Sequence, residues 1–322
     1  MDKEKVFRVV LVAALVFLIY QFGFRPIFSR GDRDIKADRK YWSELLPDEE
    51  GPVYDVIVYG AEPQGIAAAV SSARLGARTL LISEDYDMGG IISRCLIPEL
   101  EAPLDSNGKM LNAGILAEIQ KKTGDCFNPE KYVETVNELI QAESDLSAIA
   151  GSVVTGVTMG GKRIDSIEVQ TRDGKVDLSA RMYIDASDSG ALLDLCGVPN
   201  FTGSADLGME NSFMPVGLNF VMELKAGSDT NNSKLAGKSA VFNDGPVKYI
   251  PLNNSIRFEN PKICFLPDNK AIISGLHVAG VNVTDADSMR RAYETAVEEA
   301  KNLSLWLSEK FMELKDHVFS KA

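Results

Sequence analysis

A glycine-bearing turn at residues 60–65 is the part of the sequence best suited to chemistry. It reads Gly60, Ala61, Glu62, Pro63, Gln64 and Gly65, which is the frame G-x-G-x-x-G with Glu62 at the middle glycine position. In this frame the first glycine turns the chain sharply out of a strand and the last allows close helix packing, while free amides at the helix start face a diphosphate. The turn predicts a dinucleotide site, and the alternative is a strand–helix turn that binds nothing.

Acidic residues near the turn bear on this hypothesis in opposite directions. The Glu62 carboxylate would repel a diphosphate unless it points to solvent or toward a ribose hydroxyl, because like charges repel strongly where screening is poor. An acid about 20 residues after such a turn commonly binds the ribose hydroxyls, and Ser83, Glu84 and Asp85 occupy that region. We expect Ser83 and Glu84 to contribute to the site, with Glu84 as the ribose ligand. An exposed strand-end acid is the alternative for Glu84.

The segments around the turn predict the elements that position it. A short apolar run from Val53, an alanine-rich stretch and the segment RTLLISED form a strand–helix–strand pattern, which is typical of a βαβ unit. Residues 162–184 alternate apolar and polar side chains around Asp173-Gly174, which predicts a β-hairpin. Residues 213–224 and 249–273 predict further alternating strands. An antiparallel sheet inserted in this way would build a second wall over a bound ligand.

With these segments in view, the chain resembles the FAD-dependent oxidoreductase family that shares the glutathione-reductase-like flavin fold. The resemblance extends from Val53 to about His317 in one order, and it includes a pair of helices after residue 104 and a β-meander after residue 153. It implies a Rossmann-like FAD-binding βαβ domain of the α/β class, with a β-meander and an inserted antiparallel β-sheet domain. It also implies FAD as cofactor and an oxidoreductase activity on a small organic substrate.

The resemblance further implies cofactor-binding positions downstream of the turn. The Gly89-Gly90 doublet stands where the family places a loop along the cofactor, and Ser93 stands where it usually carries Thr or Ser. Val154 would offer its backbone to the adenine. The segment Asp185–Gly190 matches the family's D-A-T-G-D-G or a near variant, so Ala186, Ser187, Asp188 and Gly190 are expected at the cofactor.

The family normally continues into a segment that closes over the isoalloxazine, and the resemblance ends before such a segment. Three interpretations follow: a fragment of a longer gene, a second polypeptide that supplies the rest, or a degenerate member. The second functional hypothesis is therefore a non-catalytic protein with a nucleotide-binding fold that acts through association with a partner chain. A NAD-dependent dehydrogenase is less favoured, since the long meander belongs to the flavin architecture by resemblance.

No catalytic acid–base pair can be named from the sequence. His277 at a predicted strand end could transfer a proton, although a lone histidine is more often structural. Arg94 could bind an acidic substrate or pair on the surface. Cys95 could face the flavin, although an inert buried thiol is expected more often. The cysteines Cys95, Cys126, Cys196 and Cys264 are interpreted as mostly buried thiols, and with two histidines in the chain no metal site is predicted.

The N-terminal residues predict elements that are separate from the folded domains. The run from Val9 to Tyr20 is uninterruptedly apolar, which predicts a transmembrane anchor over 1–28; a cleaved signal or a buried helix are the alternatives. Basic residues are more numerous after this run than before it, which favours a cytoplasmic body, but a signal-anchor of opposite orientation fits as well. Residues 29–52 are charged and predict a linker.

Composition and sequence pattern also limit the classes of partner and predict the domain boundaries. A net charge of −12 argues against nucleic acid as a partner, because the protein's field would repel a phosphate backbone. The domain boundaries that we expect are 53–200 for the dinucleotide-binding domain, 201–276 for the antiparallel substrate-type domain, and 277–322 for a C-terminal helix that returns to the nucleotide-binding domain. The redox compartment is left open.

Overall fold

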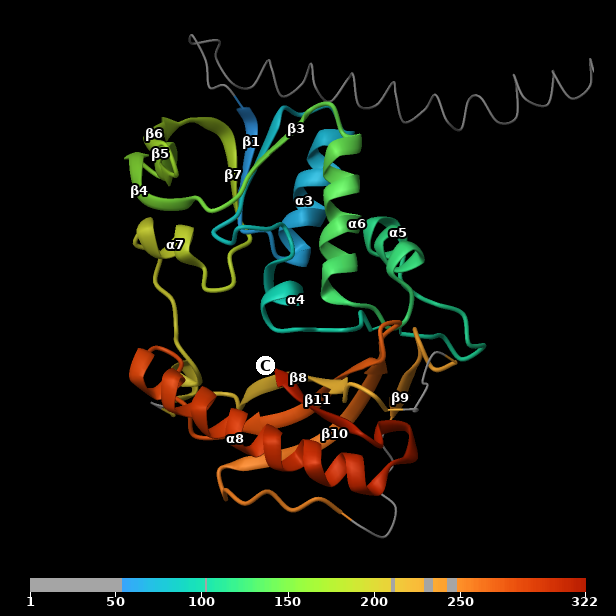
Figure 1. The fold of residues 1–322 in the computed structure, drawn as a ribbon. Helices are drawn as coiled ribbons and strands as arrows, with labels where there is room; N and C mark the ends of the chain where they lie inside the picture. The colour runs from blue at the N-terminus through green and yellow to red at the C-terminus, as the bar shows by residue number, and fades with distance from the viewer. Residues whose placement is uncertain (1–53, 102, 210–211, 229–233, 242–247) are drawn as a thin grey trace, which may run out of the picture.

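A four-stranded parallel sheet forms the centre of the first of two bodies (Figure 1). The computed structural model describes residues 54–101, 103–209, 212–228, 234–241 and 248–322. The sheet has the order β3-β2-β1-β7. Its strands are β1 (Tyr54–Tyr59), β2 (Thr79–Ile82), β3 (Leu146–Ile149) and β7 (Ala180–Asp185). Parallel pairing of β1 with β2 confirms the predicted βαβ unit.

Helices cover one face of this sheet. On that face α3 (Pro63–Arg74) and α6 (Pro129–Ala142) lie against the strands, and α4 (Gly90–Arg94) and α5 (Gly114–Thr123) pack on α6. Helix α3 buries Ile66, Ala69, Val70 and Ala73, whose spacing places them on one helical stripe against the sheet. Helix α6 begins at Asn128, whose side chain accepts a hydrogen bond from the amide of the third residue, an ordinary N-cap. The stripe and the cap explain why these segments are helical.

The β-meander covers the other face of the parallel sheet. Its strands are β4 (Val153–Gly160), β5 (Arg163–Thr171) and β6 (Gly174–Leu178), paired in the order β4-β5-β6. Ile167 and Val169 of β5 pack with Ile57 and Leu80 of the parallel sheet in one buried cluster. The Thr171↔Gly174 pair closes the turn between β5 and β6, which confirms the predicted hairpin.

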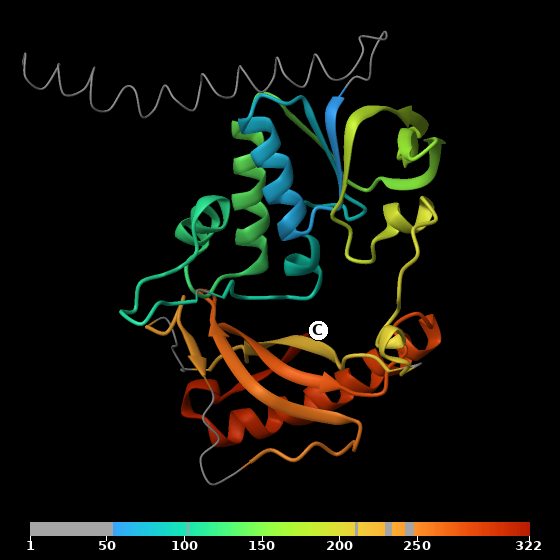
Figure 2. The same cartoon turned by 180° about the vertical axis from the view of Figure 1, so that it is seen from behind.

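The second body is a five-stranded sheet of order β12-β8-β11-β10-β9. Its strands are β8 (Val216–Leu224), β9 (Ser239–Val241), β10 (Ile256–Phe265), β11 (Lys270–Val278) and β12 (His317–Lys321). All of its pairings are antiparallel, as expected. The chain enters this body through the short helix α7 (Ala191–Leu195) and the turn Ala205–Leu207. Figure 2 shows, from behind, that the sheet lies beyond the carboxyl ends of the parallel strands.

The long C-terminal helix α8 (Ala286–Lys310) packs on this second sheet. The expectation that it returns to the nucleotide-binding domain is wrong. Its buried stripe, which includes Ala296, Ala300 and Leu303, shares a core with Phe220 of β8. After the turn Met312–Leu314, β12 pairs with β8 and keeps the chain in the same body. A helix in this segment was predicted correctly, but the sequence pattern of a helix does not state which sheet the helix covers.

A disulfide between Cys126 and Cys264 joins the two bodies across a sequence separation of 138 residues. Cys126 precedes α6 in the first body, and Cys264 lies in β10 on the sheet face opposite α8. The prediction of mostly buried thiols is therefore wrong for this pair. It is also wrong for Cys95, which is exposed, while Cys196 is partly buried. The residue types allowed either state, and the spacing did not show that two distant cysteines meet.

The predicted anchor and linker, 1–28 and 29–52, lie outside the described residues. Among the residues that the structure describes, no helix is both long and apolar enough to cross a bilayer.

Candidate functional site

The turn at residues 60–65 lies at the carboxyl ends of the parallel strands, between β1 and α3. Gly60 has φ +107°, and a Cβ atom there would lie 2.3 Å from the carbonyl oxygen of Ala186. A Cβ atom at Gly65 would lie 1.9 Å from the carbonyl oxygen of Gly60. Only glycine fits either position, because backbone atoms occupy the space that a side chain would need. The sharp turn and the close helix packing are as predicted, and the two glycines also bring the segment after β7 into direct contact with the turn.

The first amides of α3 are available to a ligand. Glu62 is the N-cap residue but its side chain makes no capping hydrogen bond, and Pro63 has no N–H to donate. Within the described part of the chain, the amides of Gln64 and Gly65 donate no hydrogen bond, and the first bonded amide is that of Ile66, 3.0 Å from Glu62 O. Helix N-termini with free amides bind anions well. The Gln64 side chain reaches back toward the carbonyl of Ala186 at 3.5 Å.

Glu62 does not point to solvent, which is one of the two directions expected for it. Its side chain is buried, with 6% of the residue exposed. One carboxylate oxygen accepts a hydrogen bond from Ile91 N at 2.8 Å, at the start of α4, and the other accepts one from Arg94 at 2.8 Å. The carboxylate therefore caps α4 and is neutralised by a guanidinium. Its pairing with Arg94 reduces the repulsion that the sequence predicts between Glu62 and a diphosphate.

Arg94 gathers carboxylates from three strand ends. Besides Glu62 after β1, it bonds Asp85 after β2 at 3.3 Å and Asp188 after β7 at 3.1 Å. Burial alone would lower the pKa of Arg94, but these carboxylates outweigh it and the net shift is upward. Burial also raises the pKa of Asp85, against the opposing effect of Arg94. The sequence left open whether Arg94 binds an acidic substrate or forms an ion pair on the surface. In the structure it pairs with three carboxylates at the candidate site.

Tyr59 connects two of the predicted cofactor residues. Its hydroxyl donates a hydrogen bond to the carboxylate of Glu84, which is exposed at the end of β2, and accepts one from Val154 N at 3.3 Å. Burial raises the pKa of Tyr59, so the hydroxyl keeps its proton. Tyr59 thus holds Glu84 and the Val154 amide together, and the expectations that Glu84 binds a ribose and that the Val154 backbone faces an adenine stay predictions. The sequence analysis predicted no role for Tyr59, although its position directly before Gly60 places it next to the turn.

The loop after β2 is organised by Asp87, which sequence reasoning also missed. Its carboxylate accepts hydrogen bonds from Gly89 N at 2.8 Å and from the Ser93 hydroxyl at 3.0 Å. Ser83 is buried and its hydroxyl donates to the carbonyl of Asp87 at 2.9 Å. Gly90 has φ +50°, with the Glu62 carboxylate packed against it. Ser83, Ser93 and the doublet thus shape the loop backbone beside the turn.

The segment after β7 is held by its own side chains. The Asp185 carboxylate accepts hydrogen bonds from Ser187 N at 3.0 Å and from the Ser187 hydroxyl at 2.7 Å. The same hydroxyl accepts one from Ala191 N at 2.9 Å, and Gly190 adopts φ +70° just before α7. Ala186 therefore presents backbone to Gly60, Asp188 faces Arg94, and Ser187 stabilises the loop. Fifteen of the sixteen predicted site residues lie at this edge of the sheet, in its loops or in α3 and α4, and Val154 lies in the adjoining meander.

A cavity of about 240 Å³ lies between the two bodies. Arg94, Cys95 and Leu96 line it from the first body, and Asn219, Val278 and Tyr293 are among its lining residues from the second. The Asn219 amide donates to Cys95 O at 2.7 Å, which ties the wall together. Desolvation raises the pKa of the Cys95 thiol, so it is not an activated nucleophile. His277 lies near the end of β11, as predicted, but it does not line this cavity.

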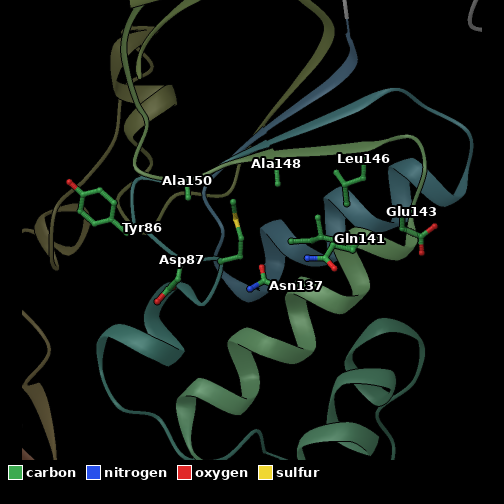
Figure 3. A pocket seen from close by; sticks show the side chains of 10 residues that line it. Tyr86, Asp87, Asn137, Gln141, Glu143, Leu146, Ala148 and Ala150 are labelled. Carbon is green, nitrogen blue, oxygen red and sulfur yellow. The ribbon is translucent and has the colours of Figure 1, made fainter. Parts of the chain in front are cut away.

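A second cavity of about 460 Å³ lies between α6 and the edge strand β3 (Figure 3). Asn137 and Gln141 of α6 line it opposite Ala148 and Ala150. It touches the loop after β2 through Asp87, but none of the predicted site residues lines it. We therefore place the candidate site at the turn and not in this cavity. Among the described residues, no group of three or more His, Cys, Asp or Glu side chains could hold a metal ion.

Comparisons with known proteins agree with this geometry. Residues 55–320 match the family model described as FAD dependent oxidoreductase. The tRNA uridine 5-carboxymethylaminomethyl modification enzyme MnmG of Treponema denticola is 26% identical over 156 residues, which are 41% of this chain and 25% of that protein.

Similar solved structures share low identity. The p-nitrophenol 4-monooxygenase PnpA from Pseudomonas putida aligns with a TM-score of 0.41 and 11% identity, covering 76% of this chain and 62% of that one. A geranylgeranyl bacteriochlorophyll reductase-like protein from Thermoplasma acidophilum aligns with a TM-score of 0.46 and 15% identity, covering 83% and 64%. The chain thus spans about a quarter of the curated relative and less than two-thirds of either structure.

Proposed function

The chain belongs to the FAD-dependent oxidoreductase family, and from that premise we propose that it is a membrane-tethered flavoprotein that oxidises or reduces a small organic substrate. FAD supplies the redox chemistry, since its ring system can accept and return a hydride or electrons. What this chain supplies is the binding, the orientation and the electrostatic surroundings. The observation that carries the proposal is the Gly60–Gly65 turn with free amides at the start of α3.

The residues present fit the diphosphate of FAD. A side chain at Gly60 or Gly65 would meet backbone, so the main chain is as tightly turned as a cradle for a diphosphate requires. The amides of Gln64 and Gly65 would hold the phosphate oxygens, and Glu84 would hold the ribose hydroxyls. Arg94 adds a positive charge at the same edge of the sheet.

The cavity between the two bodies is the place that we propose for the substrate. It adjoins Arg94 and is lined largely by apolar side chains of β8, β11 and α8, with Asn219 and Tyr293 as polar groups. Sites of this kind, apolar with a few polar groups, suit small organic molecules. The two bodies shield it from both sides, which would limit access of water to a reacting group.

Flavin retention tests the proposal directly. The full chain, purified in detergent, should carry visible flavin absorbance or acquire it on incubation with FAD. Glu84→Gln should weaken FAD binding by about fivefold or more, because a neutral amide binds ribose hydroxyls less strongly than a carboxylate. Asp173→Asn makes the same charge change in the distant β5–β6 turn and should have no effect. A wild-type chain that takes up no FAD would contradict the proposal.

The second hypothesis is a protein that acts by association with another chain. It rests on Glu62, which places a carboxylate inside the turn that would hold the diphosphate. Co-purification of a second polypeptide that restores flavin binding would support an assembly, whereas flavin uptake by the chain alone would exclude this hypothesis.

The disulfide supports a location for the folded body. Disulfides persist in oxidising compartments and are rare in the cytosol, so we place the body on the non-cytoplasmic side, tethered by the apolar run from Val9 to Tyr20. This choice opposes the count of basic residues, which favoured a cytoplasmic body. Chain from its native cells, denatured without reductant, should react with a maleimide at Cys95 and Cys196 alone, and at all four cysteines after reduction. Four reactive thiols before reduction would refute this location.

A further inference from the structure

Arg94 pairs with a buried carboxylate, that of Glu62, and with an exposed one, that of Asp188. The Glu62 side chain is 8% exposed and also holds the Ile91 amide, so it keeps its place. The Asp188 side chain is 57% exposed and reaches Arg94 from the loop after β7. One terminal nitrogen of the guanidinium bonds both carboxylates, at 2.8 Å and 3.1 Å. The bond to Glu62 anchors the arginine, and the bond to Asp188 is the one that can be exchanged.

The exchangeable bond lies beside the free amides of α3. Glu62 immediately precedes that helix, and Asp188 follows Ala186, whose backbone presses on Gly60. The Arg94–Asp188 pair therefore bridges α4 and the segment after β7 at the mouth of the turn. Within the described chain, no other basic residue forms a salt bridge with Glu62, Asp85 or Asp188. A diphosphate arriving there meets three carboxylates and one cation that is already paired.

We propose that Arg94 is the cation that binds the FAD diphosphate and that Asp188 is its internal competitor. Without FAD, Asp188 pairs with Arg94; with FAD, a phosphate oxygen replaces Asp188 while Glu62 keeps the guanidinium in position. In the exchange the guanidinium stays paired with Glu62 and Asp85, and only its bond to Asp188 passes to the phosphate, which suits the several donors of an arginine. Asp188 thus sets the affinity for the cofactor by opposing it. This inference rests on the proposed function, since it presumes that FAD binds at the turn.

Titration of the full chain with FAD, followed by flavin fluorescence, tests the competition. Asp188→Asn should lower the dissociation constant by about two- to fivefold, the range expected for removing one exposed ion pair. Asp188→Glu keeps the charge and should return the constant toward that of the wild type. Asp173→Asn, which removes a remote charge, should leave it unchanged. An Asp188→Asn variant with the wild-type constant would overturn the inference.

A double-mutant cycle separates competition for Arg94 from general repulsion. Arg94→Gln should weaken FAD binding by about tenfold, and in that background Asp188→Asn should bring no further gain, because there is no guanidinium left to release. If the gain persists without Arg94, the inference is wrong. If Arg94→Gln does not fold, the cycle is run in Arg94→Gln/Glu62→Gln, which also removes the buried carboxylate charge that the first substitution leaves unpaired.

The outcomes also distinguish this inference from the proposed function. Wild-type binding with unaltered variants would overturn the competition alone. Binding by Asp188→Asn but not by the wild type would support it strongly. Failure of every variant to bind FAD would overturn both.

Discussion

Removal of the Cys126–Cys264 disulfide should cost much more stability than removal of the two free cysteines, Cys95 and Cys196. The bond closes a loop across 138 residues of sequence separation and connects two bodies. The chain-entropy relation for a loop of this length gives about 5 kcal/mol of stabilisation. This is a large share of the total for an ordinary domain, about 5–15 kcal/mol. Both half-cystines are buried, so alanine is the replacement that leaves no hydroxyl without a partner.

Urea unfolding of the purified chain, followed by circular dichroism, measures this effect. With a slope of about 3 kcal/mol per molar urea, the double variant Cys126→Ala/Cys264→Ala should unfold about 1.5 M earlier than the wild type. The matched control is Cys95→Ala/Cys196→Ala, which removes the two cysteines outside the bond and should shift the midpoint little. Equal midpoints for the disulfide variant and the wild type under oxidising conditions would refute the reasoning.

Three further predictions concern stability. Gly60→Ala should lower the free energy of unfolding by at least about 3 kcal/mol, because it combines a left-handed φ with a backbone clash. The control Gly124→Ala has φ +82° and open space around its Cβ, so it should cost about 1 kcal/mol. Equal costs for the two variants in urea unfolding would contradict the clash. Tyr132→Phe should be neutral or stabilising by about 1 kcal/mol in the same assay, since that buried hydroxyl has no hydrogen-bond partner in the described chain; a clear loss would reveal one. Burial and the hydrogen bond to Glu299 raise the pKa of Tyr249, so its stabilising contribution is complete below pH about 10 and is lost as the pH rises above that. The urea midpoint should therefore fall above pH about 10, less steeply for Tyr249→Phe, and identical slopes would argue against this residue.

Local patterns were sufficient to predict most of the secondary structure. The strand before Gly60, the alanine-rich helix and the hairpin at Asp173-Gly174 each follow from apolar period and turn chemistry, and the structure confirms them. The position of α8 was not predictable in this way. Its apolar stripe fixed the helix and its buried face, whereas the choice of sheet depended on how β12 pairs with β8, which local pattern does not report.

The candidate site, too, could be predicted only in part from the sequence. The glycines at 60 and 65 were predictable because their conformation and packing are backbone properties. The direction of Glu62 was not, since it depends on Arg94, a residue 32 positions later. The repulsion argued from Glu62 alone omitted a cation that only the folded chain brings near. The pairing of Cys126 with Cys264 was hidden for the same reason.

The covalent bond between the two bodies changes what their contact must accomplish. The buried cluster on that side of the second sheet contains few residues, centred on the disulfide, with Val221, Leu266 and Ile272 around it. A non-covalent interface of such small apolar area would open readily. Because the disulfide holds the two bodies together, the residues that line the cavity between them can change without loss of the connection, so a related chain could accept a different substrate while keeping the same joint.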